Sequence, residues 1–110
     1  MTMQATRKIG NNRGRPRLWL QGAILEAAGF APGDHYALKV TEGKLRLRLL
    51  TKDDQPQPAE EPKQRKVSGK SDMPIVDISG DVIERAFPDG GTVRVKSANG
   101  IITARWNDEA

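Results

Sequence analysis

The side chains that could do chemistry in this chain are mainly cations, and most of them lie in its first half. Residues 1–50 hold nine basic and three acidic side chains, a net charge of +6, whereas residues 71–110 hold four and seven, a net of −3. Residues 51–70 contribute +1, which completes the overall +4. Cations gathered in one half favour contact with a polyanion such as nucleic acid. The candidates for contact with its phosphates are Arg7, Lys8, Arg13, Arg15, Arg17, Lys39, Lys44, Arg46 and Arg48.

Groups suited to catalysis are few. The single histidine, His35, stands beside Asp34 at a predicted turn, and a lone histidine at a turn is more often an incidental polar residue than a catalyst. The chain has no cysteine, and its sequence shows no cluster of metal ligands, no phosphate-binding loop and no activated nucleophile. We therefore predict that the protein is not an enzyme and that it has no catalytic residue, no metal and no cofactor.

The N-terminal residues 1–16 have the composition of a flexible basic arm, since apolar residues are few and glycines and asparagines interrupt them. Within the arm, Arg13-Gly14-Arg15-Pro16 resembles the AT-hook, a short motif that lies in the minor groove of A·T-rich DNA. A glycine allows close approach to the groove, and the flanking arginines suit its negative potential. The alternative is a solvated tail, or one that touches phosphates loosely.

Residues 17–50 must position the remaining cations. Leu18 and Leu20 alternate with polar residues, which predicts a half-buried strand, and a short helical turn follows over 23–28. Residues 36–49 then read as a hairpin with an apolar inner face and a cationic outer face. Trp19 stands on the outward side of the first strand, where it could stack on a base, fill an interface or pack under a neighbouring segment.

The same pattern occurs twice. Residues 18–28 match 76–86 at an offset of 58, and residues 30–48 match 87–105 at an offset of 57, with glycines and turns in register. We therefore predict two halves, 17–50 and 73–107, which are too short to fold alone and so form one domain within a chain or between chains. The second half is acidic, so it could instead dock a basic protein partner through Asp72, Asp77, Asp81, Glu84 and Asp89.

Residues 51–72 read as a mobile linker because they are rich in proline and charge and nearly free of apolar residues. No apolar run approaches the length of a membrane span, and the N-terminus lacks the apolar core of a signal peptide. The absence of cysteine fits a reducing compartment. We expect a soluble, cytoplasmic protein that does not bind a membrane.

Residues 17–49 resemble the SymE-like branch of the AbrB/MazE swapped-hairpin superfamily. The resemblance is carried by Leu18-Trp19-Leu20, Gln21-Gly22, residues 25–30, Pro32-Gly33-Asp34 and the turn at Glu42-Gly43. It implies a mainly β (α+β) fold with short helices, in which two βαββ halves interlock as a small β-barrel. It also implies DNA binding, as a transcriptional regulator or an architectural protein of bacterial or phage origin.

Other functions remain open at this point. SymE-like proteins are regarded as toxins that act on RNA or nucleoid DNA, and paired modules of this kind could also serve as phage or plasmid adaptors for a nucleic-acid enzyme. Our expectation is a DNA-binding protein, with double-stranded DNA as its partner. It would act as a homodimer or as a pseudo-dimer within one chain, because both halves are present.

Overall fold

Each copy of the repeat folds as a strand, a short helix and a hairpin. The computed structural model describes residues 2–12, 14–51, 53–61, 64–70, 72–88 and 90–106. The first copy consists of β3 (Arg15–Gln21), α1 (Ala23–Glu26), β4 (His35–Thr41) and β5 (Lys44–Leu50). The second consists of β8 (Met73–Ser79), α2 (Asp81–Ala86), β9 (Thr92–Ala98) and β10 (Ile101–Trp106). The described part is mainly antiparallel β with two short helices, which confirms the predicted fold class at that level.

Four further strands lie in segments that we expected to be a flexible arm and a mobile linker. They are β1 (Met3–Lys8), β2 (Gly10–Asn12), β6 (Arg65–Lys66) and β7 (Ser68–Lys70). β1 pairs with β9 over six residues, and the others pair with β3, β4 and β8 respectively. The structure differs from the expectation because these segments satisfy backbone groups along strands that would otherwise be open edges.

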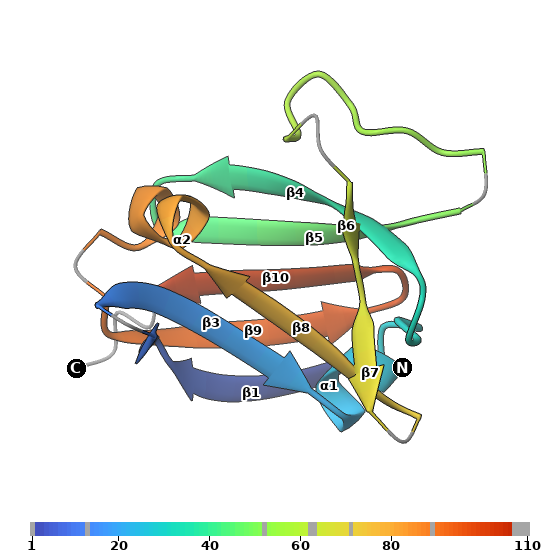
Figure 1. Cartoon of the computed structure of the whole chain (residues 1–110), viewed down its shortest axis with the longest axis horizontal. Helices are drawn as coiled ribbons and strands as arrows, with labels where there is room; N and C mark the ends of the chain where they lie inside the picture. The colour runs from blue at the N-terminus through green and yellow to red at the C-terminus, as the bar shows by residue number, and fades with distance from the viewer. Residues whose placement is uncertain are drawn as a thin grey trace.

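The strands form two open sheets, ordered β1-β9-β10-β5-β4-β6 and β2-β3-β8-β7 (Figure 1). The closed barrel that we expected is not found among the described strands. The reason lies at Ile9 and Val67, where the chain leaves one sheet and enters the other. There the backbone N–H groups bond to turn carbonyls, Ile9 to Gly91 (2.8 Å) and Val67 to Asp34 (2.7 Å), and not to a neighbouring strand.

A pseudo-two-fold axis relates the two halves. β3 and β8 pair antiparallel about Trp19 and Asp77, which are equivalent positions at the offset of 58. β5 and β10 pair antiparallel about Arg46 and Thr103, which are equivalent at the offset of 57. Two antiparallel pairings that are each centred on equivalent residues are what a two-fold relation between the halves requires.

The halves interlock through reciprocal contacts. The Gly43 N–H in the first hairpin turn donates to the Ala86 carbonyl at the end of α2 (2.7 Å), and the equivalent Gly100 N–H donates to the Ala28 carbonyl (2.8 Å). α2 also packs against β4, and α1 packs against β9. Each helix is therefore held by the hairpin of the other half.

The core lies between the sheets and is built from both halves. Leu18, Leu20, Val76 and Ile78 face it from the smaller sheet, and all are 0 % exposed. Inward residues of β5, β9 and β10 face it from the larger sheet, and the helices close its ends. The two helices in the described residues are four and six residues long, so neither could cross a bilayer.

Candidate nucleic-acid interface

Six cations gather on the outer side of the larger sheet, and we call this surface the cationic face. Inward and outward residues alternate along each strand, so burying Leu45 and Leu47 turns Lys44 and Arg46 outward. The same alternation turns the cations of β4, β9 and β10 to this side. The face consists of Lys39, Lys44, Arg46, Arg94, Lys96 and Arg105.

Like charges stand directly opposite one another across this face. Arg105 on β10 lies between Lys44 on β5 and Arg94 on β9, and Lys39 on β4 lies opposite Arg46. The outward positions of β4, β5, β9 and β10 hold no aspartate or glutamate. Like charges in direct opposition destabilise a sheet, and a bound polyanion would offset that repulsion.

The spacing of these cations suits a duplex. Neighbouring strands lie about 4.8 Å apart, so the four strands from β4 to β9 span roughly 14 Å. Cations on the two outer strands are therefore spaced to meet phosphates on both sides of a major groove, which is about 12 Å wide. A small hollow lined by Lys39, Thr41, Lys44 and Arg46 lies in the face. The pseudo-two-fold axis passes through the face between Arg46 on β5 and Thr103 on β10, which are the central pair of these two strands.

Two of the predicted cations lie elsewhere, on the smaller sheet. Arg17 donates twice to the Asp77 carboxylate at 2.8 Å, and its guanidinium stands 4.4 Å from the centre of the Trp19 ring. Trp19 itself is 39 % exposed and donates to Gln21 at 2.7 Å. The Arg15 guanidinium lies close to Gly80, since a Cβ built on Gly80 would be 2.9 Å from it. The structure therefore does not place Arg15 and Arg17 on the cationic face.

The remaining predicted residues have mixed positions. Lys8 is exposed on the outward side of β1, at the edge of the cationic face, whereas Arg7 is half-buried on the inward side. Arg13, the first residue of the AT-hook-like motif, lies outside the described residues. Arg48 is outward on β5, where the carboxylate of Glu60 holds it.

Three residues of the cationic face, Arg94, Lys96 and Arg105, were missed by reasoning from the sequence. The net charge of −3 concealed them, because it sums these cations with carboxylates such as Asp77 on the smaller sheet and Asp81 on α2. Asp77 is bound to Arg17, and Asp81 is bound to Arg85 at 3.3 Å. The repeat itself carried the missing signal, since Lys96 and Arg105 are equivalent to Lys39 and Arg48.

The groups considered for other functions are dispersed. His35 stands on β4 opposite Leu50 and Lys66, so its described strand neighbours include no acidic partner. Of the carboxylates suggested for docking a protein, Asp77 and Asp81 are engaged within the chain, and Asp89 lies outside the described residues. Among the described residues, no group of three potential metal ligands lies together.

Comparison of the chain with models of protein families, with curated proteins and with solved structures found no match.

Proposed function

We propose that the protein binds double-stranded DNA through the cationic face, as a transcriptional regulator or an architectural protein. One observation carries the proposal, namely that two halves of the chain contribute six cations to one outer face, where several stand opposite like charges. Cations that neutralise phosphates release the counterions condensed on the DNA. This release supplies most of the affinity of non-specific DNA binding.

The symmetry of the face supports a duplex as the ligand. Duplex DNA has local two-fold axes between its strands, and the pseudo-two-fold axis of the protein passes through the centre of the cationic face. Lys39 and Lys96, which are equivalent, then stand on opposite sides of that axis. We further propose that the chain is a single-chain member of the AbrB/MazE-like swapped-hairpin proteins, since each helix is held by the other half's hairpin.

The test is fluorescence anisotropy with labelled duplex DNA over a series of salt concentrations. If five or six cations meet phosphates, the slope of log affinity against log salt is expected to be about −5. The double variant Lys39→Ala/Lys96→Ala should reduce the steepness of that slope by about 2 and weaken binding at every salt concentration. A slope that stays flat for the unaltered protein would contradict the proposal.

A matched control removes two cations that lie away from the face. Arg15→Ala/Arg17→Ala changes the net charge by the same amount, and both residues lie on β3 of the smaller sheet. Its slope should stay close to that of the unaltered protein. Equal losses in both double variants would show that net charge, and not this face, governs binding.

The same assay separates the rival functions. Labelled single-stranded RNA replaces the duplex in a parallel series, and its cleavage is followed on a gel with His35→Ala as the control. Preference for RNA, or cleavage that His35→Ala abolishes, would favour the toxin over the DNA-binding protein. We expect tighter binding to duplex DNA and no cleavage.

A further inference from the structure

Residues 53–61, which we call the return segment, fold back over one end of the cationic face. The segment follows β5 and leads back toward β6, which pairs with β4 (Figure 1). Its Glu61 N–H donates to the Leu38 carbonyl of β4 at 2.7 Å. Ala37 and Leu50 occupy outward positions on β4 and β5, yet both are buried and neither belongs to the main core. The return segment therefore covers this end of the sheet.

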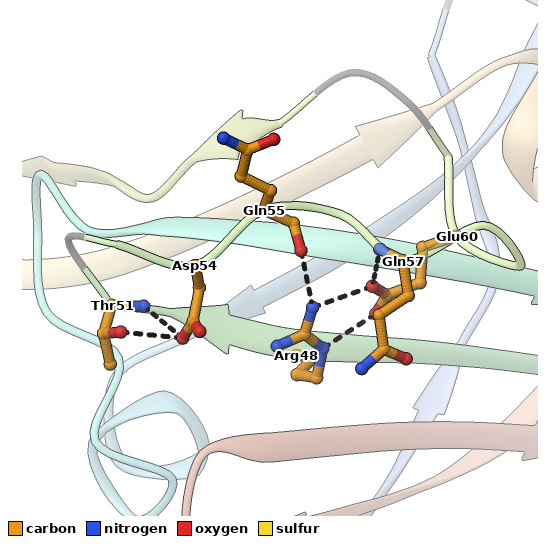
Figure 2. Close-up of polar contacts among 6 residues, drawn as sticks. All are labelled: Arg48, Thr51, Asp54, Gln55, Gln57 and Glu60. Atoms are coloured by element: carbon orange, nitrogen blue, oxygen red, sulfur yellow. Dashed lines mark hydrogen bonds and ion pairs between the residues drawn. The ribbon is translucent and has the colours of Figure 1, made fainter.

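A carboxylate of this segment holds Arg48 in a bidentate contact. The Arg48 Nε lies 3.0 Å from one Glu60 oxygen and its Nη2 lies 2.9 Å from the other (Figure 2). Arg48 Nη2 also donates to the Gln55 carbonyl at 3.1 Å, and the Gln57 N–H donates to Glu60 at 2.8 Å. The Glu60 side chain is only 5 % exposed. These hydrogen bonds, first of all those from Arg48, lower the pKa of Glu60, so its carboxylate is charged at neutral pH.

The equivalent position in the second half is arranged differently. Arg105 corresponds to Arg48 at the offset of 57, and it is exposed between two cations, Lys44 and Arg94. Arg94 in turn corresponds to Ala37, which is buried under the return segment. The pseudo-two-fold axis thus relates the backbone at the two ends of the cationic face. The return segment covers the end that holds Arg48, whereas Arg105 at the other end is exposed.

We infer that Glu60 competes within the chain with nucleic acid for Arg48, its carboxylate taking the bidentate position that a phosphate would take. The inference rests on the proposed function. Arginine binds carboxylate and phosphate with the same planar pair of donors, so one excludes the other. Glu60 thereby withholds Arg48 from phosphates and limits how many cations the face offers.

The variant Glu60→Gln tests this inference, because glutamine keeps the size of the side chain and removes its charge. We expect it to bind duplex DNA more tightly than the unaltered protein and to steepen the salt slope by about 0.9, the value of one added phosphate contact. The gain in affinity should therefore be about 3.5-fold larger at 50 mM salt than at 200 mM. Asp53→Asn is the matched control, since Asp53 is an exposed carboxylate of the same segment.

Arginine variants supply an independent measurement that does not require Glu60 to be altered. In the unaltered protein, Arg105→Ala should reduce the slope by about 0.9, whereas Arg48→Ala should leave it unchanged. In the Glu60→Gln background, Arg48→Ala should abolish the gain. Thermal unfolding of each variant, followed by circular dichroism, identifies any whose fold is lost.

The outcomes distinguish the inference from the function beneath it. If Lys39→Ala/Lys96→Ala weakens binding but Glu60→Gln does not strengthen it, the proposed function stands and the competition is refuted. An equal gain in Asp53→Asn would also refute it, because net charge would then explain the effect. If Lys39→Ala/Lys96→Ala has no effect, the proposed function itself fails.

Discussion

At the scale of single residues, Tyr36 shows how burial sets the chemistry of a side chain. It is the only tyrosine in the chain and is 2 % exposed, with its ring 5.9 Å from that of Phe30. Burial raises the pKa of Tyr36 to about 12, a rise that Arg65 opposes and Asp77 reinforces. Its ultraviolet absorbance should therefore titrate about two pH units above that of an exposed tyrosine.

This pKa also determines how stability depends on pH. Between about pH 10 and pH 12 the unfolded chain loses the phenolic proton and the folded chain keeps it. The free energy of unfolding should be level with respect to this group below about pH 10, and should fall by about 2 to 3 kcal/mol as the pH rises to about 12. Denaturant unfolding measured across this range checks it. Tyr36→Phe should remove the fall in the free energy of unfolding that comes from the phenol. If the fall between about pH 10 and pH 12 is unchanged in Tyr36→Phe, other groups cause it.

At the scale of elements, the hairpin turns hold the two halves together. Gly43 and Gly100 are equivalent, both have positive φ (80° and 77°), and each donates to a helix-end carbonyl of the other half. They differ in their surroundings, because a Cβ on Gly43 would meet the Trp106 ring at 3.1 Å, whereas one on Gly100 would meet nothing within 4 Å.

Alanine at both turns therefore separates backbone strain from steric contact. Gly100→Ala should destabilise the protein by about 1 to 2 kcal/mol, the cost of a left-handed conformation for a residue with a Cβ. Gly43→Ala should destabilise it by about 1 kcal/mol more, because the Trp106 ring must shift from its packing on Phe87. Chemical denaturation of the two variants gives the comparison. Equal losses would show that the ring moves without penalty.

At the scale of the whole molecule, the reciprocal contacts predict one cooperative unfolding transition. Both halves contribute to one core, and neither sheet belongs to one half alone. Trp19 lies on β3 of the first half and Trp106 on β10 of the second, so each reports on a different half.

Single-tryptophan variants make this testable. In Trp19→Phe and in Trp106→Phe, the fluorescence of the remaining tryptophan should follow the same denaturation curve as the circular dichroism of the whole chain. The comparison is made within each variant, so a change in overall stability does not affect it. Separate midpoints for the two signals would indicate halves that unfold independently.

The pattern of the sequence determined the elements of each half. Apolar residues at every second position of residues 44–49 require a strand with one buried side, and the same rule turns Lys44, Arg46 and Arg48 outward. Glycines in register predicted the hairpin turns and the duplication. The repeat also begins earlier than we predicted, because Arg7-Lys8-Ile9 matches Arg65-Lys66-Val67 at the same offset of 58.

Tertiary structure alone decided which surfaces the cations share. The residues of β1 have weak strand character by themselves, and they form a strand because the edge of β9 offers hydrogen-bonding partners. Arg94 and Lys44 are 50 positions apart, and they share a face because β10 lies between their strands. Arg48 is neutralised by a glutamate from a segment that composition predicted to be mobile. Alternation along a strand tells which side a residue faces, but only long-range pairing decides which strands lie beside it.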